Sequence, residues 1–234
     1  MRISTQDIKT FIKCPILHHL GRHYKSAERE LIESLRHAIE YLYSYQYAHG
    51  SPCNFNALIK RWNQMWWGKK KPDDKKAMEL SNKAYGALDK YYSSYIDIKS
   101  EICAVNFPYE VGIGPHIITG TWPVVLSENG EALLYYPLSQ KNTKQLVRDI
   151  ITKADVVAMH TTTGNPPLKV IHSRYSPNHP DRQVILIEEF YPKEAWLEKS
   201  VDALTMIITI MEKGMIWGNC HACLTCELRN KCTG

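Results

Sequence analysis

Residues 116–138 read HIITGTWPVVLSENGEALLYYPL, and this stretch decides the fold class. Its first part, from His116 to Leu126, is rich in β-branched side chains, and its last part, from Ala132 to Leu138, is mostly apolar. The dipeptide Asn129-Gly130 stands between them and favours the positive φ angles of a tight hairpin turn. The stretch therefore predicts two antiparallel strands joined by a short turn.

Further elements are expected on both sides of this hairpin. Residues 102–111 alternate loosely between apolar and polar side chains, and two short runs at 168–175 and 183–189 also have strand character. Helical spacing of apolar residues predicts one helix at about 143–159 and another from about 193 to 213. Strands and helices in this order indicate an α/β fold.

The part of the chain before these strands predicts helices instead. Ser4 can cap a short helix that runs through Lys13, and either Asn54 or Asn56 can cap another after the break at 50–52. We therefore expect a single domain at 1–234, made of a helical region at 1–99, a sheet core at 100–192, and a closing helix with a cysteine tail at 193–234.

Composition and charge limit the class of protein. The 234 residues are 44% hydrophobic and 23% charged, which is enough to bury one substantial core. No apolar run reaches the length of a membrane span, and the first residues favour an amphipathic helix over a secretory leader. We therefore expect a soluble, cytoplasmic protein with no membrane partner. The net charge of +5, together with 14 Tyr and 6 Trp, permits binding to DNA.

The cysteines indicate a metal centre. The chain has 7 Cys, of which four lie close together, at Cys220, Cys223, Cys226 and Cys232, while Cys14 stands near the other end. Thiolates spaced by two residues wrap around one metal or cluster more readily than they form separate disulfides. Zinc, held by four thiolates or by three and His221, fits this spacing, and so does an iron–sulfur cluster. Cys53 and Cys103 are interpreted as ordinary packed or surface thiols.

The order of elements, taken together with the cysteines, resembles a known family. Cys14-Pro15 follows a short helix, Lys213-Gly214 closes the last helix, and a Cys-x2-Cys-x5-Cys pattern comes after it. These features resemble the RecB-type nucleases of the PD-(D/E)XK superfamily that carry an iron–sulfur cluster, such as CRISPR-associated exonucleases and AddB-type recombination subunits. The resemblance implies a restriction-endonuclease-like core and a [4Fe–4S] cluster on Cys14, Cys223, Cys226 and Cys232, with Cys220 as an alternative ligand.

The catalytic motifs of that family are degenerate in this chain. The family carries a His on an early helix, which His37 retains as a relic. It carries a metal-binding Asp three residues after a strand Gly, but Gly120 is followed by Pro123 at that position. The next strand should carry Asp/Glu-x-Lys, and residues 133–141 hold no acid and no lysine in the right phase. Mg²⁺ needs carboxylate and water oxygens, so we expect no catalytic residues here.

Three functions remain open at this point. The favoured one is a catalytically inactive DNA-binding or scaffold subunit of a larger nucleic-acid-processing complex, with Lys69, Lys70 and Lys71 in contact with DNA. The second is an active Mg²⁺- or Mn²⁺-dependent DNA exonuclease that uses displaced acids such as Glu110, Glu128 or Glu131. The third is a zinc-stapled protein-interaction module, which would show no salt-dependent affinity for DNA.

Overall fold

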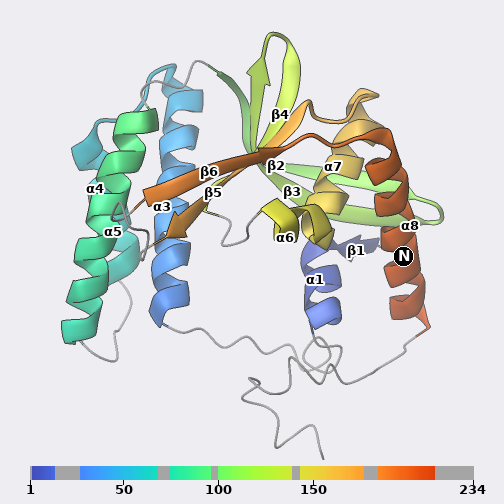
Figure 1. Cartoon of the computed structure of the whole chain (residues 1–234), viewed down its shortest axis with the longest axis horizontal. Helices are drawn as coiled ribbons and strands as arrows, with labels where there is room; N and C mark the ends of the chain where they lie inside the picture. Colours follow the sequence, from blue (N-terminus) through green and yellow to red (C-terminus); the bar gives the residue numbers. More distant parts are fainter. Residues whose placement is uncertain are drawn as a thin grey trace, which may run out of the picture.

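A central sheet with helices on both of its faces makes up the described part of the chain (Figure 1). The structure is a computed structural model and describes residues 2–13, 27–67, 74–95, 100–138, 143–176 and 184–213. This architecture confirms the mixed α/β class expected from the sequence. None of the described helices combines the length and the apolar character that crossing a membrane requires.

The described strands form one mixed six-stranded sheet. They are β1 (Arg2–Ser4), β2 (Glu101–Ile113), β3 (His116–Glu128), β4 (Glu131–Tyr136), β5 (Lys169–Ser176) and β6 (Val184–Phe190). The order is β1-β3-β4-β5-β6, with β2 paired along the other edge of β3. β1 and β4 share one edge of β3, since β1 pairs with residues 117–119 and β4 with residues 124–128. The β1–β3 and β4–β5 pairs are parallel, and the other pairs are antiparallel.

The helices follow the predicted segments with one exception. They are α1 (Thr5–Lys13), α3 (Ala27–His49), α4 (Phe55–Trp67), α5 (Asp74–Tyr95), α6 (Thr143–Arg148), α7 (Ile150–Thr163) and α8 (Glu194–Glu212). The single helix expected at about 143–159 is two helices, α6 and α7. Asp149 separates them because its carboxylate accepts the backbone N–H of Thr152 at 3.2 Å and so caps a new helix.

The capping and turn signals of the sequence are confirmed. Ser4 Oγ accepts the backbone N–H of Asp7 at 3.0 Å at the start of α1. Asn54, rather than Asn56, caps α4, since its Oδ1 accepts the backbone N–H of Ala57 at 2.9 Å. Asn129 and Gly130 have φ angles of 54° and 83°, as a tight β3–β4 turn requires.

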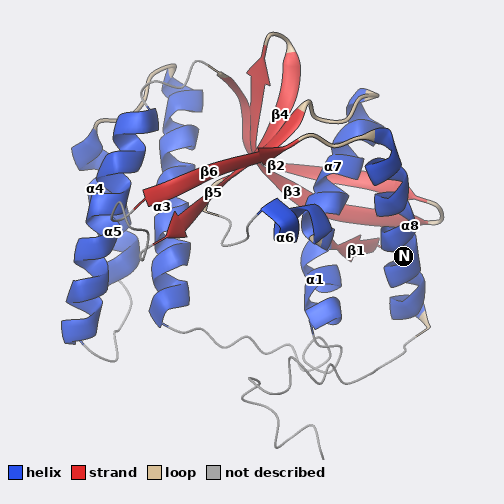
Figure 2. Cartoon of the chain, in the orientation of Figure 1, coloured by secondary structure: helices blue, strands red, loops and turns tan. Residues whose placement is uncertain are grey.

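Two apolar cores lie on opposite faces of the sheet. Helices α3, α4 and α5 cover one face, where Leu133 and Tyr135 of β4 meet them. Helices α1, α7 and α8 cover the other face, where Leu134 packs with them (Figure 2). Residues 133, 134 and 135 thus alternate between the cores, as neighbouring residues of a strand do.

The β2–β3 ribbon changes faces in its middle. Trp122 packs in the core of α7, whereas Val124, two residues later on the same strand, packs in the core of α3. On β2, Val105 lies opposite Val124 and packs with the same core, whereas Tyr109, opposite Gly120, packs in the core of Trp122. Asn106 lies in this irregular stretch with a φ of 51°, in the left-handed region. A local irregularity of this kind reverses which face each later side chain occupies.

Candidate functional site

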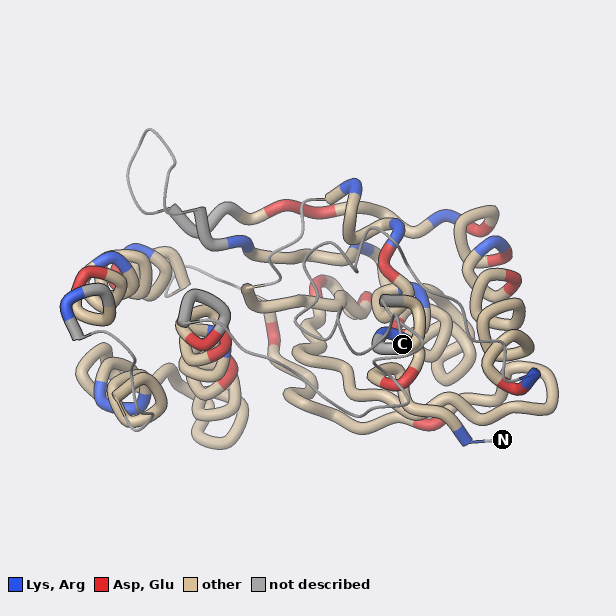
Figure 3. The backbone as a smooth tube through the Cα atoms, turned by 90° about the horizontal axis from the view of Figure 1, so that it is seen from below, with Lys and Arg blue, Asp and Glu red and all other residues tan. Residues whose placement is uncertain are grey.

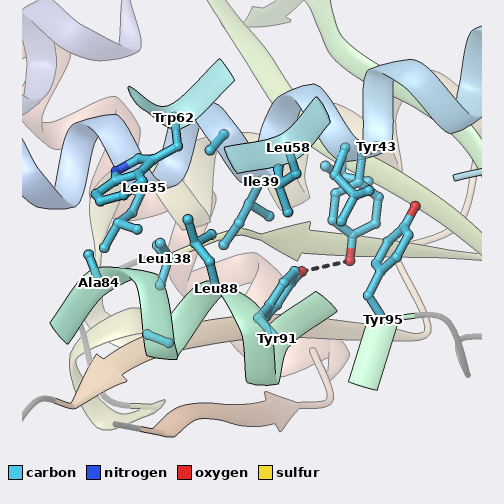
Figure 4. Close-up of a cluster of buried hydrophobic side chains, with 14 of the residues drawn as sticks. Leu35, Ile39, Tyr43, Leu58, Trp62, Ala84, Leu88, Tyr91, Tyr95 and Leu138 are labelled. Carbon is cyan, nitrogen blue, oxygen red and sulfur yellow. Dashed lines mark hydrogen bonds between the residues drawn. The ribbon is translucent and has the colours of Figure 1, made fainter. Parts of the chain in front are cut away.

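A chain of hydrogen-bonded hydroxyls joins α3 and α5 to β4 and β5 on the face that these helices cover. The hydroxyls of Tyr43 and Tyr91 lie 2.9 Å apart (Figure 4), and those of Tyr91 and Tyr135 lie 2.7 Å apart. Tyr135 donates to Ser173 Oγ at 2.8 Å, and Ser173 Oγ accepts the backbone N–H of Leu138 at 2.9 Å. We call Tyr43, Tyr91, Tyr135 and Ser173 the tyrosine–serine network. It lies on the strand where the resemblance predicts the family's Asp/Glu-x-Lys motif.

The network is buried and uncharged. Tyr43, Tyr91 and Tyr135 are between 1% and 4% exposed, and Ser173 is fully buried. Burial raises the pKa of all three phenols, so each stays neutral at physiological pH. Neutral phenols inside an apolar core replace neither of the carboxylates that would hold Mg²⁺.

The two remaining motif positions lie elsewhere. Pro123 is partly buried on β3, between Trp122 of one core and Val124 of the other. His37 lies on the solvent side of α3, with 44% of its side chain exposed and Nδ1 2.9 Å from Glu40 Oε2. The hydrogen-bond partner of His37, Glu40, therefore belongs to the same helix. Among the described residues, no three His, Cys, Asp or Glu side chains lie close enough together to hold a metal ion.

An active nuclease could use Glu110, Glu128 or Glu131 as alternative metal ligands. The first two of these acids form ion pairs. Glu110 pairs with Arg2. Glu128 lies 3.1 Å from Lys169 Nζ, and Glu189 of β6 lies 3.5 Å from the same atom. The hydrogen bond to Glu128 raises the pKa of Lys169, so this lysine stays charged. Glu131 is exposed and lies opposite Glu128 in the hairpin register. Two carboxylates and a lysine from three strands therefore meet at this end of the sheet.

The residues predicted to bind metal and those predicted to contact DNA lie outside the described part of the chain. These are Cys14, Cys220, Cys223, Cys226 and Cys232 for the metal and Lys69, Lys70 and Lys71 for DNA. The described helices that lead to the cysteines pack against each other, and α1 and α8 end on the same side of the molecule (Figure 1). Of the two cysteines interpreted as ordinary thiols, Cys53 is buried and Cys103 is exposed.

A buried carboxylate that the sequence analysis missed holds α7 to the sheet. Asp155 is 1% exposed, and its two carboxylate oxygens accept the hydroxyls of Tyr109 and Tyr136, each at 2.6 Å. Its backbone oxygen accepts Trp122 Nε1 at 2.9 Å. Burial and the charge of Asp155 raise the pKa of Tyr109, which therefore remains a donor. The available signal was an acid within the apolar run 154–159 of α7.

Gly120 makes this arrangement possible. It pairs with Tyr109 across the β2–β3 ribbon. A Cβ added at Gly120 would lie 2.8 Å from Tyr109 Cε1 and closer still to the hydroxyl, which is less than any side chain tolerates. The glycine that the resemblance assigned to a catalytic motif therefore has a packing role here, since it leaves room for the Tyr109 ring to reach Asp155.

A second polar cluster links α6 to β5 and β6. Glu188 accepts the backbone N–H of Thr143 at 2.9 Å and also its hydroxyl. His172 is fully buried, with Nε2 3.3 Å from Thr143 Oγ1 and 3.6 Å from Glu188 Oε2. Arg174 Nη2 lies 3.5 Å from the other oxygen of Glu188. Hydrogen bonds from Thr143 lower the pKa of Glu188, and burial lowers that of His172.

Comparisons with known proteins assign no family. No family model and no curated protein matches the sequence. Among solved structures, a crystal structure of SSO0001 aligns with 86% of this chain and 85% of its own, at 13% identity and a TM-score of 0.29. A similarity at that level carries no argument about fold or function.

Proposed function

We propose that this chain is a catalytically inactive iron–sulfur relative of the RecB-type PD-(D/E)XK nucleases and serves as a DNA-binding or scaffold subunit of a larger nucleic-acid-processing complex. The observation that carries the proposal is the tyrosine–serine network. On the strand expected to carry Asp/Glu-x-Lys, Tyr135 is buried and bonded to Tyr91 and Ser173. Phosphodiester cleavage through Mg²⁺ needs carboxylates and an attacking water, and the tyrosine–serine network offers neither a carboxylate nor an exposed oxygen.

The positions of α1 and α8 support a metal staple between the two ends of the chain. Cys14 directly follows α1, and Cys220 comes seven residues after Lys213, the residue that closes α8. Seven residues span at most about 25 Å when extended. Since the two helices pack together and end on the same side, thiolates from both segments can reach one cluster. A [4Fe–4S] cluster bound by Cys14, Cys223, Cys226 and Cys232 would fix both ends on the sheet.

Metal analysis of anaerobically purified protein tests the staple. We expect stoichiometric iron and sulfide, with loss of iron and of folded yield in Cys14→Ala and Cys226→Ala. Cys103→Ala is the matched control, because that thiol is exposed on β2 and outside the proposed ligand set. Zinc without iron would contradict the cluster and favour the interaction module. A normal iron content in Cys14→Ala would remove Cys14 from the ligands.

A nuclease assay distinguishes the proposed inactive protein from an active Mg²⁺- or Mn²⁺-dependent DNA exonuclease. Single- and double-stranded DNA should stay intact with the protein in Mg²⁺ or Mn²⁺. One observation favours the alternative, namely that Lys169 lies between the carboxylates of Glu128 and Glu189. Cleavage that is lost in Glu128→Gln but kept in Glu131→Gln would assign the activity to that end of the sheet and refute an inactive protein.

DNA binding is measured directly by fluorescence anisotropy. We expect an affinity that falls steeply with salt and that decreases when Lys69, Lys70 and Lys71 are all replaced by Gln. A wild-type protein that binds neither single- nor double-stranded DNA at low salt would leave only the scaffold role.

A further inference from the structure

Four ring side chains stand in a row along α3. His37, Tyr41, Tyr45 and His49 are spaced four residues apart, so they follow one another along one flank of the helix. The rings of Tyr45 and His49 stack at 4.1 Å with an interplanar angle of 14°, and those of Tyr41 and Tyr45 lie 6.1 Å apart. His49 Nδ1 lies 2.9 Å from the backbone oxygen of Tyr45, which fixes the orientation of the imidazole. We call these four residues the α3 ladder.

The ladder lies at the surface but is anchored from below. His37 and His49 are exposed, whereas Tyr41 and Tyr45 are half-buried and pack against the core under α3. A stacking platform needs rings that are held in place yet reachable from solvent, because ordering free side chains costs entropy on binding. Tyr41 and Tyr45 are held in place by their contacts with the core, and their exposed part can be reached from solvent.

A positively charged side chain lies beside the α3 ladder. The guanidinium of Arg61, an exposed residue of α4, lies over the Tyr41 ring at 5.8 Å from its centroid. Lys60 stands next to Arg61, and α4 carries basic but no acidic residues (Figure 3). The nearby carboxylate of Glu40 is held by Arg36 at 3.4 Å and by His37 at 2.9 Å. The flank therefore presents aromatic rings beside the Arg61 guanidinium, with the Glu40 carboxylate paired.

We propose that the α3 ladder, with Arg61, binds a single strand of DNA by stacking bases on its rings and placing phosphates beside Arg61. The inference rests on the proposed function and names the form of DNA and the surface that binds it. The Tyr45 and His49 rings already stack on each other at 4.1 Å, so a base would stack on an outer face of this pair and not between the two rings. Duplex bases have both faces covered by their neighbours, whereas an unpaired base offers its face to an aromatic ring.

Binding of a fluorescein-labelled oligo-dT, with a hairpin duplex of equal charge as the comparison, tests the surface. Tyr45→Leu keeps apolar volume against the core but removes the ring. Each base–aromatic stack contributes about 1 kcal/mol or more, so the affinity for oligo-dT should fall about fivefold or more. Arg61→Gln should weaken binding and reduce the slope of log affinity against log salt by about 0.7.

Tyr47→Leu is the matched control. Tyr47 is 57% exposed on the same helix, but it lies two residues from Tyr45, a rotation of about 200° around the axis. Its substitution should change the affinity less than twofold. Urea unfolding of each variant confirms that a lost affinity is not a lost fold.

The outcomes separate the ladder from the broader proposal. Wild-type binding that is unaffected by Tyr45→Leu and Arg61→Gln, yet lost in the Lys69–Lys71 triple variant, would refute the ladder and keep the DNA-binding function. Tighter binding to the duplex than to oligo-dT would also refute it. No binding to either probe would refute the DNA-binding function itself.

Discussion

Replacing Gly120 by alanine should break the bond between the sheet and α7. The added methyl group would collide with the Tyr109 ring, whose hydroxyl donates to the buried carboxylate of Asp155 at 2.6 Å. Tyr109 is 6% exposed, so its ring cannot swing away without displacing its neighbours in the core. Movement of the ring would also leave Asp155 with one hydroxyl donor, Tyr136.

Two energetic costs set the loss of stability in Gly120→Ala, and they do not both occur in full. Overpacking a filled site costs about 1–3 kcal/mol. Loss of a hydrogen bond to a buried charged group costs about 1.5–3 kcal/mol. Because a ring that moves relieves the collision but gives up the hydrogen bond, the two costs do not add in full. We expect the free energy of unfolding to fall by about 2–4 kcal/mol.

Urea unfolding followed by tryptophan fluorescence measures this loss, since Trp122 donates to the backbone of Asp155 and reports on the same contact. Gly112→Ala is the control. Gly112 also lies on the β2–β3 ribbon, but a Cβ added there meets nothing within 4 Å. Its substitution should change stability by no more than about 0.5 kcal/mol, the usual range for a surface site. A Gly120→Ala protein that stays within the same range would refute the packing role of Gly120.

Two further predictions concern the buried polar groups. Tyr135→Phe removes the hydroxyl that joins Tyr91 to Ser173, and thermal or urea unfolding should show a loss of about 1–2 kcal/mol; the exposed Tyr85→Phe is the control and should show none. Stability should also fall in acid, in two stages. Burial holds the pKa of His172 below the unfolded value of about 6.5, so the unfolded chain gains its proton first and stability declines below about pH 6.5. Hydrogen bonds from Thr143 hold the pKa of Glu188 below its unfolded value of about 4.3, so its contribution is present above that pH and is lost as the pH falls further. Urea midpoints between pH 8 and pH 3 measure both stages, and Glu188→Gln should flatten the second; an unchanged profile in that variant would exclude Glu188 as its source.

The sequence predicted those elements whose signals are local. Asn129-Gly130 fixes the β3–β4 turn by its own backbone preferences, and Ser4 marks the start of α1 by capping it. Such signals act within a few residues, so they can be read without knowing what lies across the fold.

What the sequence did not reveal depends on distant partners. The face change near Asn106 and Pro123 becomes visible only when β2 and β3 are paired and the two cores are in place. Asp155 looks like an ordinary helix acid until Tyr109 and Tyr136 are brought to it from β2 and β4. Asp149 was a local cap signal, but the apolar periodicity on both sides of it concealed the break between α6 and α7.

The predictions for metal binding and DNA binding rest on the sequence alone. The cysteine cluster and the Lys69–Lys71 turn were derived from spacing and resemblance, and they lie outside the described residues, so both remain predictions. At the positions where the resemblance predicts a nuclease motif, the sequence showed that the expected acids are absent. It could not predict that phenols from α3 and α5 would fill the space beside β4, because those helices are far away in sequence.

The pairing of β1 with β3 has a consequence for how the chain is made. Arg2 lies opposite Ile117, and α1 packs on α7 and α8, so β1 and α1 dock on elements that are synthesised much later than themselves. Closing so long a loop is entropically costly and slow. Ile3, Ile8 and Phe11 are buried in the finished fold and depend on these later elements for cover. A nascent chain that stops before β3 and α7 would therefore lack the main partners of β1 and α1 and would display these apolar side chains to chaperones and proteases.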